Sequence, residues 1–405
     1  MRVLVTTMGS PSHGRAQLPL VGALVAAGHQ VLVATTPALA SVFAHERVRV
    51  VECLTDQVPG YHETPRLFEL AERKDLAEPE RQRLMGRVLA AALTGTSARE
   101  MHAALRPVVE DFRPDLILRD GMDMSSVLTS EQRSVPQLPT PSGASNVLDP
   151  VDLLPGLNEL RAENGLPVQD DPLSLVPYGR VDYVPAGYSF ARHLPTSLAY
   201  RQTLTVARGA ALPPWVVDLP VDRPLVFAAL GTALPHLLRE SQGRGSGRLP
   251  FPMPHPVETM RSITRAAALL ADCTVIVASV GLPVEAEALP PHVRLVEYLP
   301  QPLLLESVDL FLTHGGFNSV REALRTGTPM AVLPQFGDQF SNAERVVELG
   351  LGRQVGEATP EGIARVCRAV LADPEVSARA RRARLAMLTL PEAERAAGDL
   401  ERIAG

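Results

Sequence analysis

The sequence predicts an α/β protein of two domains, each a Rossmann-like parallel sheet covered by helices on both faces. The chain has 405 residues, which exceeds one ordinary hydrophobic core and fits two domains of roughly 200 residues each. Short, almost continuously apolar segments alternate with helical patterns, as is typical of buried parallel strands. The second half of the chain repeats this alternation after a proline-rich stretch.

The first half opens on a compact strand–helix–strand unit. Residues Arg2–Thr7 form a β-branched run, and Gln17–Ala27 carries apolar side chains at helical spacing before Gly28, a residue type that often ends helices. The crossover to the next strand is expected to be right-handed. A mostly helical stretch is expected from Pro65 to Glu110. The further strands predicted in this half are Gln30–Thr36, Val48–Cys53, Asp115–Asp120 and Val135–Leu138.

The second half contains five short apolar strands with helical patterns between them, notably Ser319–Thr326 and Asn342–Leu349. The predicted strands are Leu225–Thr232, Thr274–Ser279, Val293–Tyr298, Leu310–Thr313 and Met330–Leu333. We expect a first domain over residues 1–210, a linker over 211–224 and a second domain over 225–385. A C-terminal helix within 386–405 is expected to pack back toward the first domain.

Composition and charge exclude several classes of partner. The net charge is -6 and no basic run occurs, so no nucleic-acid partner is expected. No apolar run of roughly 18 residues occurs, so no membrane span is expected. The first residues run directly into a strand pattern without the features of a secretory signal, which predicts a cytoplasmic protein. The three cysteines, Cys53, Cys273 and Cys367, lie far apart and form no metal-ligand spacing.

A glycine-rich turn between a predicted strand and a predicted helix suits phosphate binding. Here the sequence reads Thr-His-Gly-Gly-Phe-Asn-Ser over residues 313–319. Two glycines allow close approach of the backbone to a ligand. The first amides of the following helix have no intrahelical acceptors, and together with the helix dipole they attract an anion. Strand–glycine–helix turns are common, so the turn alone does not establish a nucleotide site.

Two flanking segments give the turn a specific context. Upstream stands Glu-Tyr-Leu-Pro-Gln-Pro-Leu-Leu over residues 297–304, and downstream stands Pro-Gln-Phe-Gly-Asp-Gln-Phe-Ser-Asn over residues 334–342. The stretch 297–342 resembles the donor-binding motif of the family 1 glycosyltransferases, which include actinobacterial antibiotic and natural-product enzymes. The resemblance extends weakly over almost the whole chain. It implies the GT-B fold, in which two Rossmann-like parallel-sheet domains face each other across a cleft.

The resemblance also implies roles for residues of the donor site. An aromatic ring at position 298 is expected to stack on the nucleotide base, although many plant members have tryptophan where this chain has tyrosine. The backbone at 299 should meet the base edge, the side chains at 301 and 322 the ribose, and the turn from 314 to 319 the pyrophosphate. The expected nucleotide-binding residues are Thr232, Tyr298, Leu299, Gln301, His314, Gly315, Gly316, Phe317, Asn318, Ser319 and Glu322. Asp338 and Gln339 are expected to bind the sugar hydroxyls.

A general base is expected in the first half. Transfer of a sugar to a hydroxyl requires removal of the hydroxyl proton, for which histidine is well suited. We place His13 in the loop after the first strand, and Asp120 at the end of the strand Asp115–Asp120, so that both project from the carboxyl edge of one sheet. Asp120 would orient the His13 ring, and the resemblance implies the same two roles. Asp123 remains an alternative to Asp120.

No Asp-x-Asp pair ends a strand in the donor half, so no metal and no other cofactor is expected. The helix amides and His314 would stabilise the leaving diphosphate instead. A single displacement would invert the anomeric configuration, as the resemblance also implies. The donor is expected to be a dTDP- or UDP-linked sugar, with a thymidine-linked deoxysugar preferred.

The acceptor is expected to be a small hydrophobic aglycone such as a polyketide, macrolide or enediyne, bound by apolar residues within 56–100 and 139–200. The candidate lining residues are Tyr61, Phe68, Met85, Met101, Tyr188 and Phe190. Two alternatives stay open at this point: a nucleotide-sugar epimerase on the same fold, and a non-catalytic sugar-nucleotide-binding subunit. A homodimer is also open.

Overall fold

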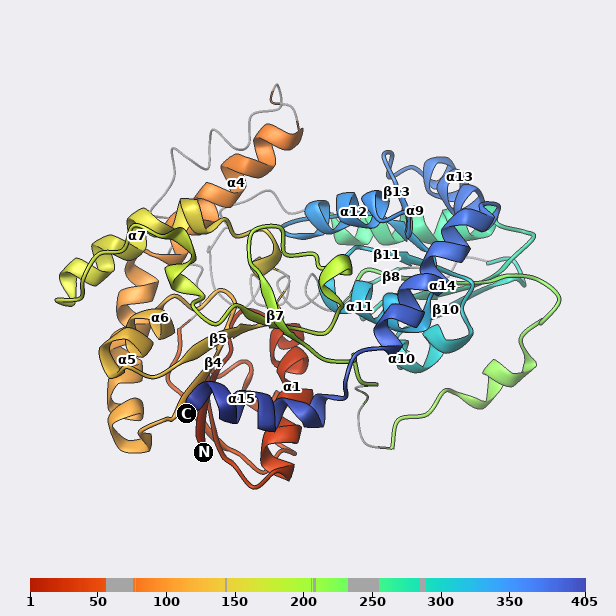
Figure 1. The fold of residues 1–405 in the computed structure, drawn as a ribbon. Helices are drawn as coiled ribbons and strands as arrows, with labels where there is room; N and C mark the ends of the chain where they lie inside the picture. The colour runs from red at the N-terminus through yellow and green to blue at the C-terminus, as the bar shows by residue number, and fades with distance from the viewer. Residues whose placement is uncertain are drawn as a thin grey trace. The chain divides into compact units, whose positions relative to one another are not determined.

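The computed structural model describes residues 1–55, 76, 78–142, 144–204, 206, 209–231, 255–284 and 289–405. These residues form two compact units (Figure 1). The first unit consists of Met1–Arg201 together with Pro391–Gly405, and the second consists of Gln202–Leu390. The chain therefore returns to the first unit at its C-terminus.

The first unit contains a five-stranded parallel sheet in the order β3-β2-β1-β4-β5. Its strands are β1 (Arg2–Thr6), β2 (Gln30–Thr35), β3 (Arg49–Glu52), β4 (Leu116–Asp120) and β5 (Gln137–Thr140). Its helices are α1 (Pro11–Ala26), α4 (Glu78–Leu93), α5 (Thr96–Phe112), α6 (Ser125–Arg133), α7 (Pro150–Glu163) and α15 (Ala396–Ala404). Two short strands, β6 (Arg180–Asp182) and β7 (Thr196–Ala199), form a separate pair.

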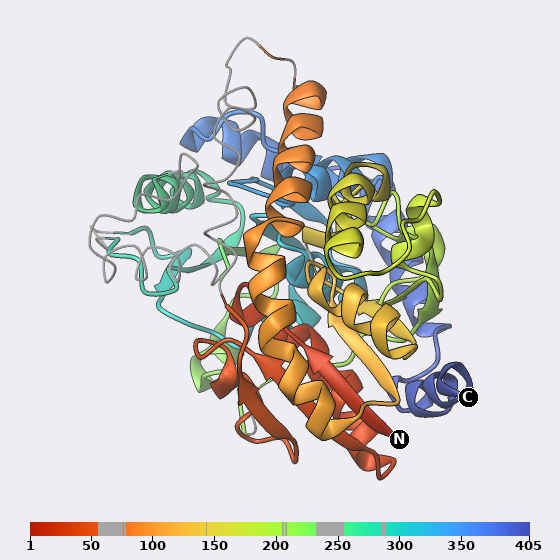
Figure 2. The same cartoon turned by 90° about the vertical axis from the view of Figure 1, so that its left-hand side faces the viewer.

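Alternate residues of this sheet face two different helical layers. Val3 and Val5 share a buried cluster with Leu20 of α1 and Leu400 of α15. Leu4, which points to the opposite face because side chains alternate along a strand, belongs to a second cluster with residues of α5. Figure 2 shows the orange helices crossing the strands of this sheet. The sheet is thus covered on both faces, which explains its nearly continuous apolar strands.

The second unit contains a six-stranded sheet in the order β10-β9-β8-β11-β12-β13, again with parallel pairings. Its strands are β8 (Leu225–Ala229), β9 (Thr274–Ala278), β10 (Val293–Val296), β11 (Leu310–Thr313), β12 (Met330–Val332) and β13 (Gly352–Gln354). Its helices are α9 (Pro256–Leu269), α10 (Gln301–Leu304), α11 (Phe317–Thr326), α12 (Gln339–Glu348), α13 (Pro360–Leu371) and α14 (Pro374–Leu388). Single 3₁₀ turns occur in both units: η1 (Ala40–Phe43), η2 (Ala144–Asn146), η3 (Pro172–Leu175), η4 (Ala186–Tyr188), η5 (Pro214–Asp218), η6 (Leu305–Ser307) and η7 (Ala393–Arg395).

One face of the second sheet packs against α9 and α13. Val226, Ala228 and Val275 share a buried cluster with Met260 of α9 and Ile363 of α13. Elsewhere in this sheet, the rings of Phe227 and Phe311 on the neighbouring strands β8 and β11 stack with their centroids 5.4 Å apart.

The predicted α/β class with two parallel sheets is confirmed, and so is the approximate position of each predicted strand. Some boundaries differ. Helix α1 begins at Pro11, six residues before the predicted Gln17, because a proline at the first helical position needs no amide partner. The strands β6, β7 and β13 were not predicted; they have three or four residues each, and β13 is a Gly-Arg-Gln segment without an apolar pattern. Part of the predicted helical stretch, residues 65–75, lies outside the described residues.

In the described ranges, no helix has both the length and the apolar character needed to cross a bilayer.

Candidate active site

The His13–Asp120 pair lies where the strand order of the first sheet reverses. Strands β1 and β4 are neighbours there, and their carboxyl ends flank the point at which ligands of open α/β sheets bind. Asp120 is the last residue of β4. The prediction that His13 lies in a loop was wrong, because the helix that starts at Pro11 makes His13 the third residue of α1.

The imidazole of His13 contacts the carboxylate of Asp120. The distance from His13 Nδ1 to Asp120 Oδ2 is 2.9 Å, and the Asp120 side chain is almost completely buried. The other carboxylate oxygen, Oδ1, accepts a hydrogen bond of 3.0 Å from the amide of Met122. A proton on Nδ1 that faces the carboxylate leaves Nε2 as the unprotonated nitrogen. The pair therefore has the geometry of a histidine base oriented by a carboxylate.

Asp123, the alternative partner, has a different environment. Its oxygens accept hydrogen bonds from the hydroxyls of Thr6, Ser125 and Ser126 and from the amide of Ser126. Asp123 therefore accepts hydrogen bonds from the first residues of α6 and connects this helix to Thr6 of β1. The Thr6 hydroxyl also accepts a hydrogen bond of 3.3 Å from the backbone amide of Asp120, so one side chain connects the Asp123 carboxylate to the Asp120 backbone. Among the two aspartates, Asp120 is the one in contact with His13.

In the second unit, His314 lies at the corresponding reversal of strand order, between β8 and β11. It follows β11 directly and is 7% exposed. The ring is enclosed by two glycines: a Cβ atom would lie 2.5 Å from the ring at Gly231 and 2.3 Å from it at Gly316. No other residue type fits at these positions without displacing the imidazole. Gly316 is also the residue before the first turn of α11, so the ring stands at the amino end of that helix.

Burial lowers the pKa of His314 to about 4, and a hydrogen bond with the backbone of Ala229 offsets only part of this effect. The ring is therefore neutral near pH 7. It can donate or accept a hydrogen bond at the amino end of α11, but it does not supply a positive charge there before a ligand binds.

The lowered pKa of His314 predicts a pH dependence of stability. A histidine in the unfolded chain binds its proton below about pH 6.5, whereas His314 in the folded chain does not until about pH 4. The unfolded state therefore binds more protons in this window, and the free energy of unfolding should fall as the pH falls from 6.5 to 4. Denaturant unfolding at several pH values measures this. His314→Gln should flatten the dependence, whereas His255→Gln, at an exposed position of the same unit, should leave it unchanged.

Three of the predicted nucleotide-binding residues contact one another beside this turn. Gln301, the first residue of α10, donates from Nε2 to Glu322 Oε2 at 2.7 Å and to Ser319 Oγ at 3.2 Å. Glu322 and Ser319 are both on α11. Close in sequence, Tyr298 is 68% exposed whereas Leu299 is buried. The tyrosine ring is thus a surface group of this unit and not a core residue.

The downstream segment is tied to the glycine turn by Asn342. Its side-chain nitrogen Nδ2 donates to the carbonyl of Gly315 at 2.9 Å and to the carboxylate of Asp338 at 2.7 Å. Gln339 is 3% exposed, and its Oε1 accepts hydrogen bonds from the amides of Gln335 and Phe336. Asp338 is therefore placed beside the turn, while the carboxamide oxygen of Gln339 shapes its own loop. Thr232 lies outside the described residues.

The candidate acceptor residues divide into three groups. Met101 and Phe190 are each 1% exposed in the first unit, and their role as lining residues stays a prediction. Met85 and Tyr188 are half-buried. Tyr61 and Phe68 lie outside the described residues.

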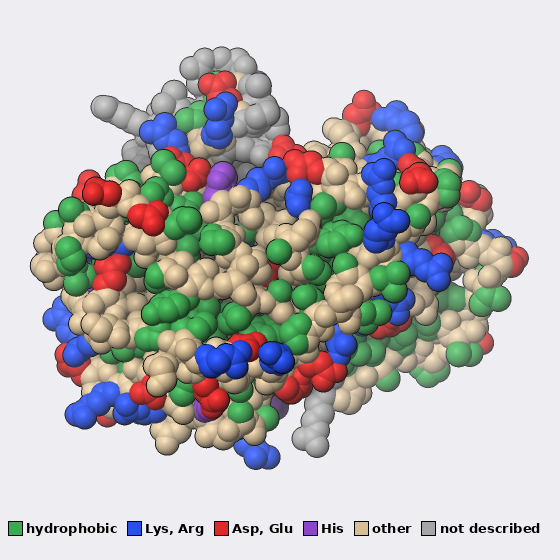
Figure 3. Space-filling view, in the orientation of Figure 1, with side chains coloured by type: hydrophobic (Ala, Val, Ile, Leu, Met, Phe, Trp, Pro, Cys, Tyr) green, Lys and Arg blue, Asp and Glu red, His purple; other side chains and the backbone are tan. Residues whose placement is uncertain are grey.

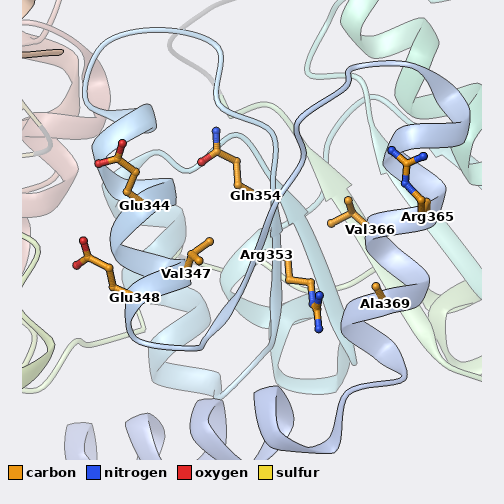
Figure 4. A pocket seen from close by; sticks show the side chains of 8 residues that line it. All are labelled: Glu344, Val347, Glu348, Arg353, Gln354, Arg365, Val366 and Ala369. Carbon is orange, nitrogen blue, oxygen red and sulfur yellow. The ribbon is translucent and has the colours of Figure 1, made fainter. Parts of the chain in front are cut away.

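A surface groove lies elsewhere in the second unit, between α12 and α13 at the β13 edge (Figure 4). None of the predicted site residues lines it. Two of its arginines form exposed ion pairs, Arg353 with Asp373 and Arg365 with Glu357. On the face drawn in Figure 3, basic and acidic side chains are interspersed.

Comparison with known proteins identifies the relatives of the chain. Residues 262–403 match the family model described as the erythromycin biosynthesis protein CIII-like C-terminal domain. The L-demethylnoviosyl transferase of Streptomyces niveus is 27% identical over 371 residues, covering 89% of this chain and 86% of that protein. The NDP-glycosyltransferase YjiC of Bacillus subtilis is 27% identical over 316 residues, covering 73% of this chain and 74% of that protein.

The fold has solved counterparts. Spinosyn rhamnosyltransferase SpnG, solved with thymidine diphosphate, matches with a TM-score of 0.74 and 20% identity over 99% of this chain and 100% of that one. The same enzyme solved with spinosyn aglycone also gives a TM-score of 0.74, with 21% identity and the same coverage. The chain is therefore a glycosyltransferase with the GT-B fold, similar to enzymes of antibiotic biosynthesis.

Proposed function

We propose that the chain is an inverting, metal-independent glycosyltransferase that moves a sugar from a dTDP- or UDP-linked donor to a hydroxyl of a hydrophobic natural product. The observation that carries the proposal is the contact of 2.9 Å between His13 Nδ1 and Asp120 Oδ2, which gives the first unit an oriented base. A non-catalytic binding subunit would not need this pair.

His13 acts on the acceptor in this proposal. Its Nε2 takes the proton of the acceptor hydroxyl while the hydroxyl oxygen forms a bond to the anomeric carbon of the sugar. The bond from that carbon to the diphosphate oxygen breaks, and its electron pair leaves with the nucleoside diphosphate. Asp120 holds the ring and stabilises the imidazolium that forms. One displacement from the face opposite the leaving group inverts the anomeric configuration.

The second unit binds the donor in this proposal. The amino-terminal amides of α11, at Phe317, Asn318 and Ser319, stabilise charge on the leaving diphosphate. His314 adds a hydrogen bond as a neutral ring. With these groups in place the reaction needs no divalent cation.

Other side chains of the second unit position the rest of the donor. Tyr298 stacks on the base, Gln301 and Glu322 bind the ribose, and Asp338 contacts sugar hydroxyls, with Gln339 beside it. The carboxamide of Gln301 is already held by Glu322, so this part of the site is organised before a ligand arrives.

The names of the relatives support a more specific donor and acceptor. One structural neighbour was solved with thymidine diphosphate and with a spinosyn aglycone, and a sequence relative is named as a demethylnoviosyl transferase. We therefore favour a thymidine-linked deoxysugar and a polyketide-like acceptor, with UDP-glucose as the second donor to test.

Product analysis tests this function. The purified chain is incubated with labelled dTDP- and UDP-sugars, with and without a panel of aglycones, and in parallel with excess chelator. We expect a glycosylated aglycone of inverted configuration, formed equally well in chelator. An epimerised donor without acceptor would indicate the epimerase, and bound but unchanged donor would indicate a binding subunit. Loss of transfer in chelator, restored specifically by magnesium or manganese, would contradict the metal-independent mechanism.

A further inference from the structure

A completely buried arginine, Arg119, precedes Asp120, the partner of the candidate base, on β4. Its Nε donates to Gln137 Oε1 at 2.8 Å, and one terminal nitrogen donates to the carbonyls of Asp120 and Gly121 at 3.3 and 3.2 Å. The other terminal nitrogen donates to the carbonyl of Leu175 at 3.2 Å. The guanidinium thus holds the backbone at the end of β4 that carries Asp120.

The turn after Arg119 leaves little freedom for another arrangement. A Cβ atom at Gly121 would lie 2.3 Å from the Cβ of Ser145 and 2.8 Å from the hydroxyl of Ser142. The backbone that accepts hydrogen bonds from the guanidinium is therefore also packed closely against Ser142 and Ser145.

Two buried carboxylates attract this cation. Asp120 and Asp123 both have no exposed surface, and a buried carboxylate that lacks a compensating charge is costly. Burial lowers the pKa of Arg119 to about 10, an effect that attraction to Asp123 and Asp120 partly offsets. Arg119 therefore stays positively charged at neutral pH. Together the three groups carry one net negative charge.

Two further titratable groups that interact with Asp123 are neutral. Burial lowers the pKa of His102 on α5, which interacts with Asp123, so this ring is uncharged at neutral pH. Burial and the charge of Asp123 raise the pKa of the Cys53 thiol, which follows β3, so the thiol keeps its proton. Neither group therefore adds charge to the cluster formed by Arg119, Asp120 and Asp123.

We propose that Arg119 and Asp123 are positioning residues that balance each other's charge, so that the cluster of Arg119, Asp120 and Asp123 acts on His13 with the charge of a single carboxylate and leaves the ring able to accept the proton of the acceptor. The proposal rests on the proposed function, in which His13 is the base. With Arg119 in place, protonation of His13 brings the cluster from one negative charge to zero. Without Arg119 the cluster would carry two negative charges and would attract a proton on His13 more strongly.

Titration of His13 in full-length variants tests this directly. The ring signals of carbon-13-labelled histidine are followed by NMR against pH, and the His13 signal is assigned by its loss in His13→Gln. Arg119→Met should raise the titration midpoint of His13, because removal of a cation beside Asp120 favours the protonated ring. Asp123→Asn should lower the midpoint. The double variant Arg119→Met/Asp123→Asn restores the net charge and should bring the midpoint back toward the parent value.

The matched control is Arg161→Met. Arg161 is also completely buried and pairs with Glu131 on α6, so its loss disturbs the same unit without removing charge from the cluster. It should lower thermal stability and leave the His13 midpoint in place. If Arg119→Met does not fold, Asp123→Asn still tests the proposal by itself. An unchanged His13 midpoint in that variant overturns the proposal. A double variant that titrates like Arg119→Met also overturns it.

The pH profile of transfer separates this inference from the proposed function. The acid limb of kcat/KM should move with the NMR midpoint in each variant. If the midpoints move as expected but the acid limb does not, the charge balance stands and His13 is not the base. If the midpoints do not move while transfer occurs normally, the inference fails and the proposed function stands.

Discussion

His13→Ala is expected to slow transfer to an aliphatic alcohol by about 10²–10⁴, the usual contribution of a positioned general base. The acceptor oxygen must lose its proton as it attacks, and the variant leaves Asp120 without the ring that its Oδ2 contacts. Single-turnover transfer with saturating donor measures the chemical step. The acceptor should be an aliphatic alcohol and not an acidic phenol, because a phenol ionises unaided and would conceal the loss.

The same variant should leave donor binding nearly unchanged, because every residue predicted to bind the donor belongs to the second unit. Nucleoside diphosphate affinity measured by calorimetry should stay within a few-fold of the parent. His45→Ala, at an exposed position of the first unit, serves as the control for histidine loss. A His13→Ala protein that melts normally and still transfers at nearly the parent rate would show that His13 is not the base.

The sequence was informative wherever a structural element requires a particular residue pattern within a short segment. Buried parallel strands need continuous apolar segments, and those segments predicted ten strands of the two sheets. The glycine turn was visible in the sequence because the His314 ring leaves room only for glycine at position 316. The same ring requires glycine at position 231, after β8. The end of β4 was also visible, since an acidic residue after an apolar run is conspicuous.

Features that depend on packing between distant segments could not be predicted in the same way. Asp120 and Asp123 are three residues apart, and only the fold shows that one contacts His13 while the other bonds to Thr6 and the start of α6. Arg119 reads as an interruption of an apolar strand. Its role becomes visible only with the carbonyl of Leu175, which lies 56 residues further along the chain.

Gln339 shows that a motif can predict a ligand contact for a side chain that also bonds to its own loop. Motif resemblance predicts that its side chain meets the sugar, yet its Oε1 holds two backbone amides of the preceding turn. A motif can retain a residue because it shapes a loop, because it contacts a ligand, or for both reasons. Sequence alone does not distinguish a residue that shapes a loop from one that contacts a ligand, since either role keeps the same residue at the same position.

Tyr298→Ala is expected to weaken binding of the nucleoside diphosphate by about 1–3 kcal/mol, the range for loss of one base–aromatic stack. At 25 °C this corresponds to about 5- to 150-fold in the dissociation constant. The ring is 68% exposed, so its removal takes little apolar surface out of the interior and thermal stability should change little. Calorimetry with dTDP and UDP measures the loss.

Two further variants distinguish stacking from other contributions of this side chain. Tyr298→Phe and Tyr298→Trp keep an aromatic face and should retain most of the affinity, whereas a hydroxyl contact would be lost in both. Tyr178→Ala removes a tyrosine that is 43% exposed in the first unit and should not affect binding. Because Leu299 next to the ring is buried, the backbone there is anchored independently of the ring. Equal affinities for Tyr298→Ala and the parent would therefore mean that the base is held by groups other than the aromatic face.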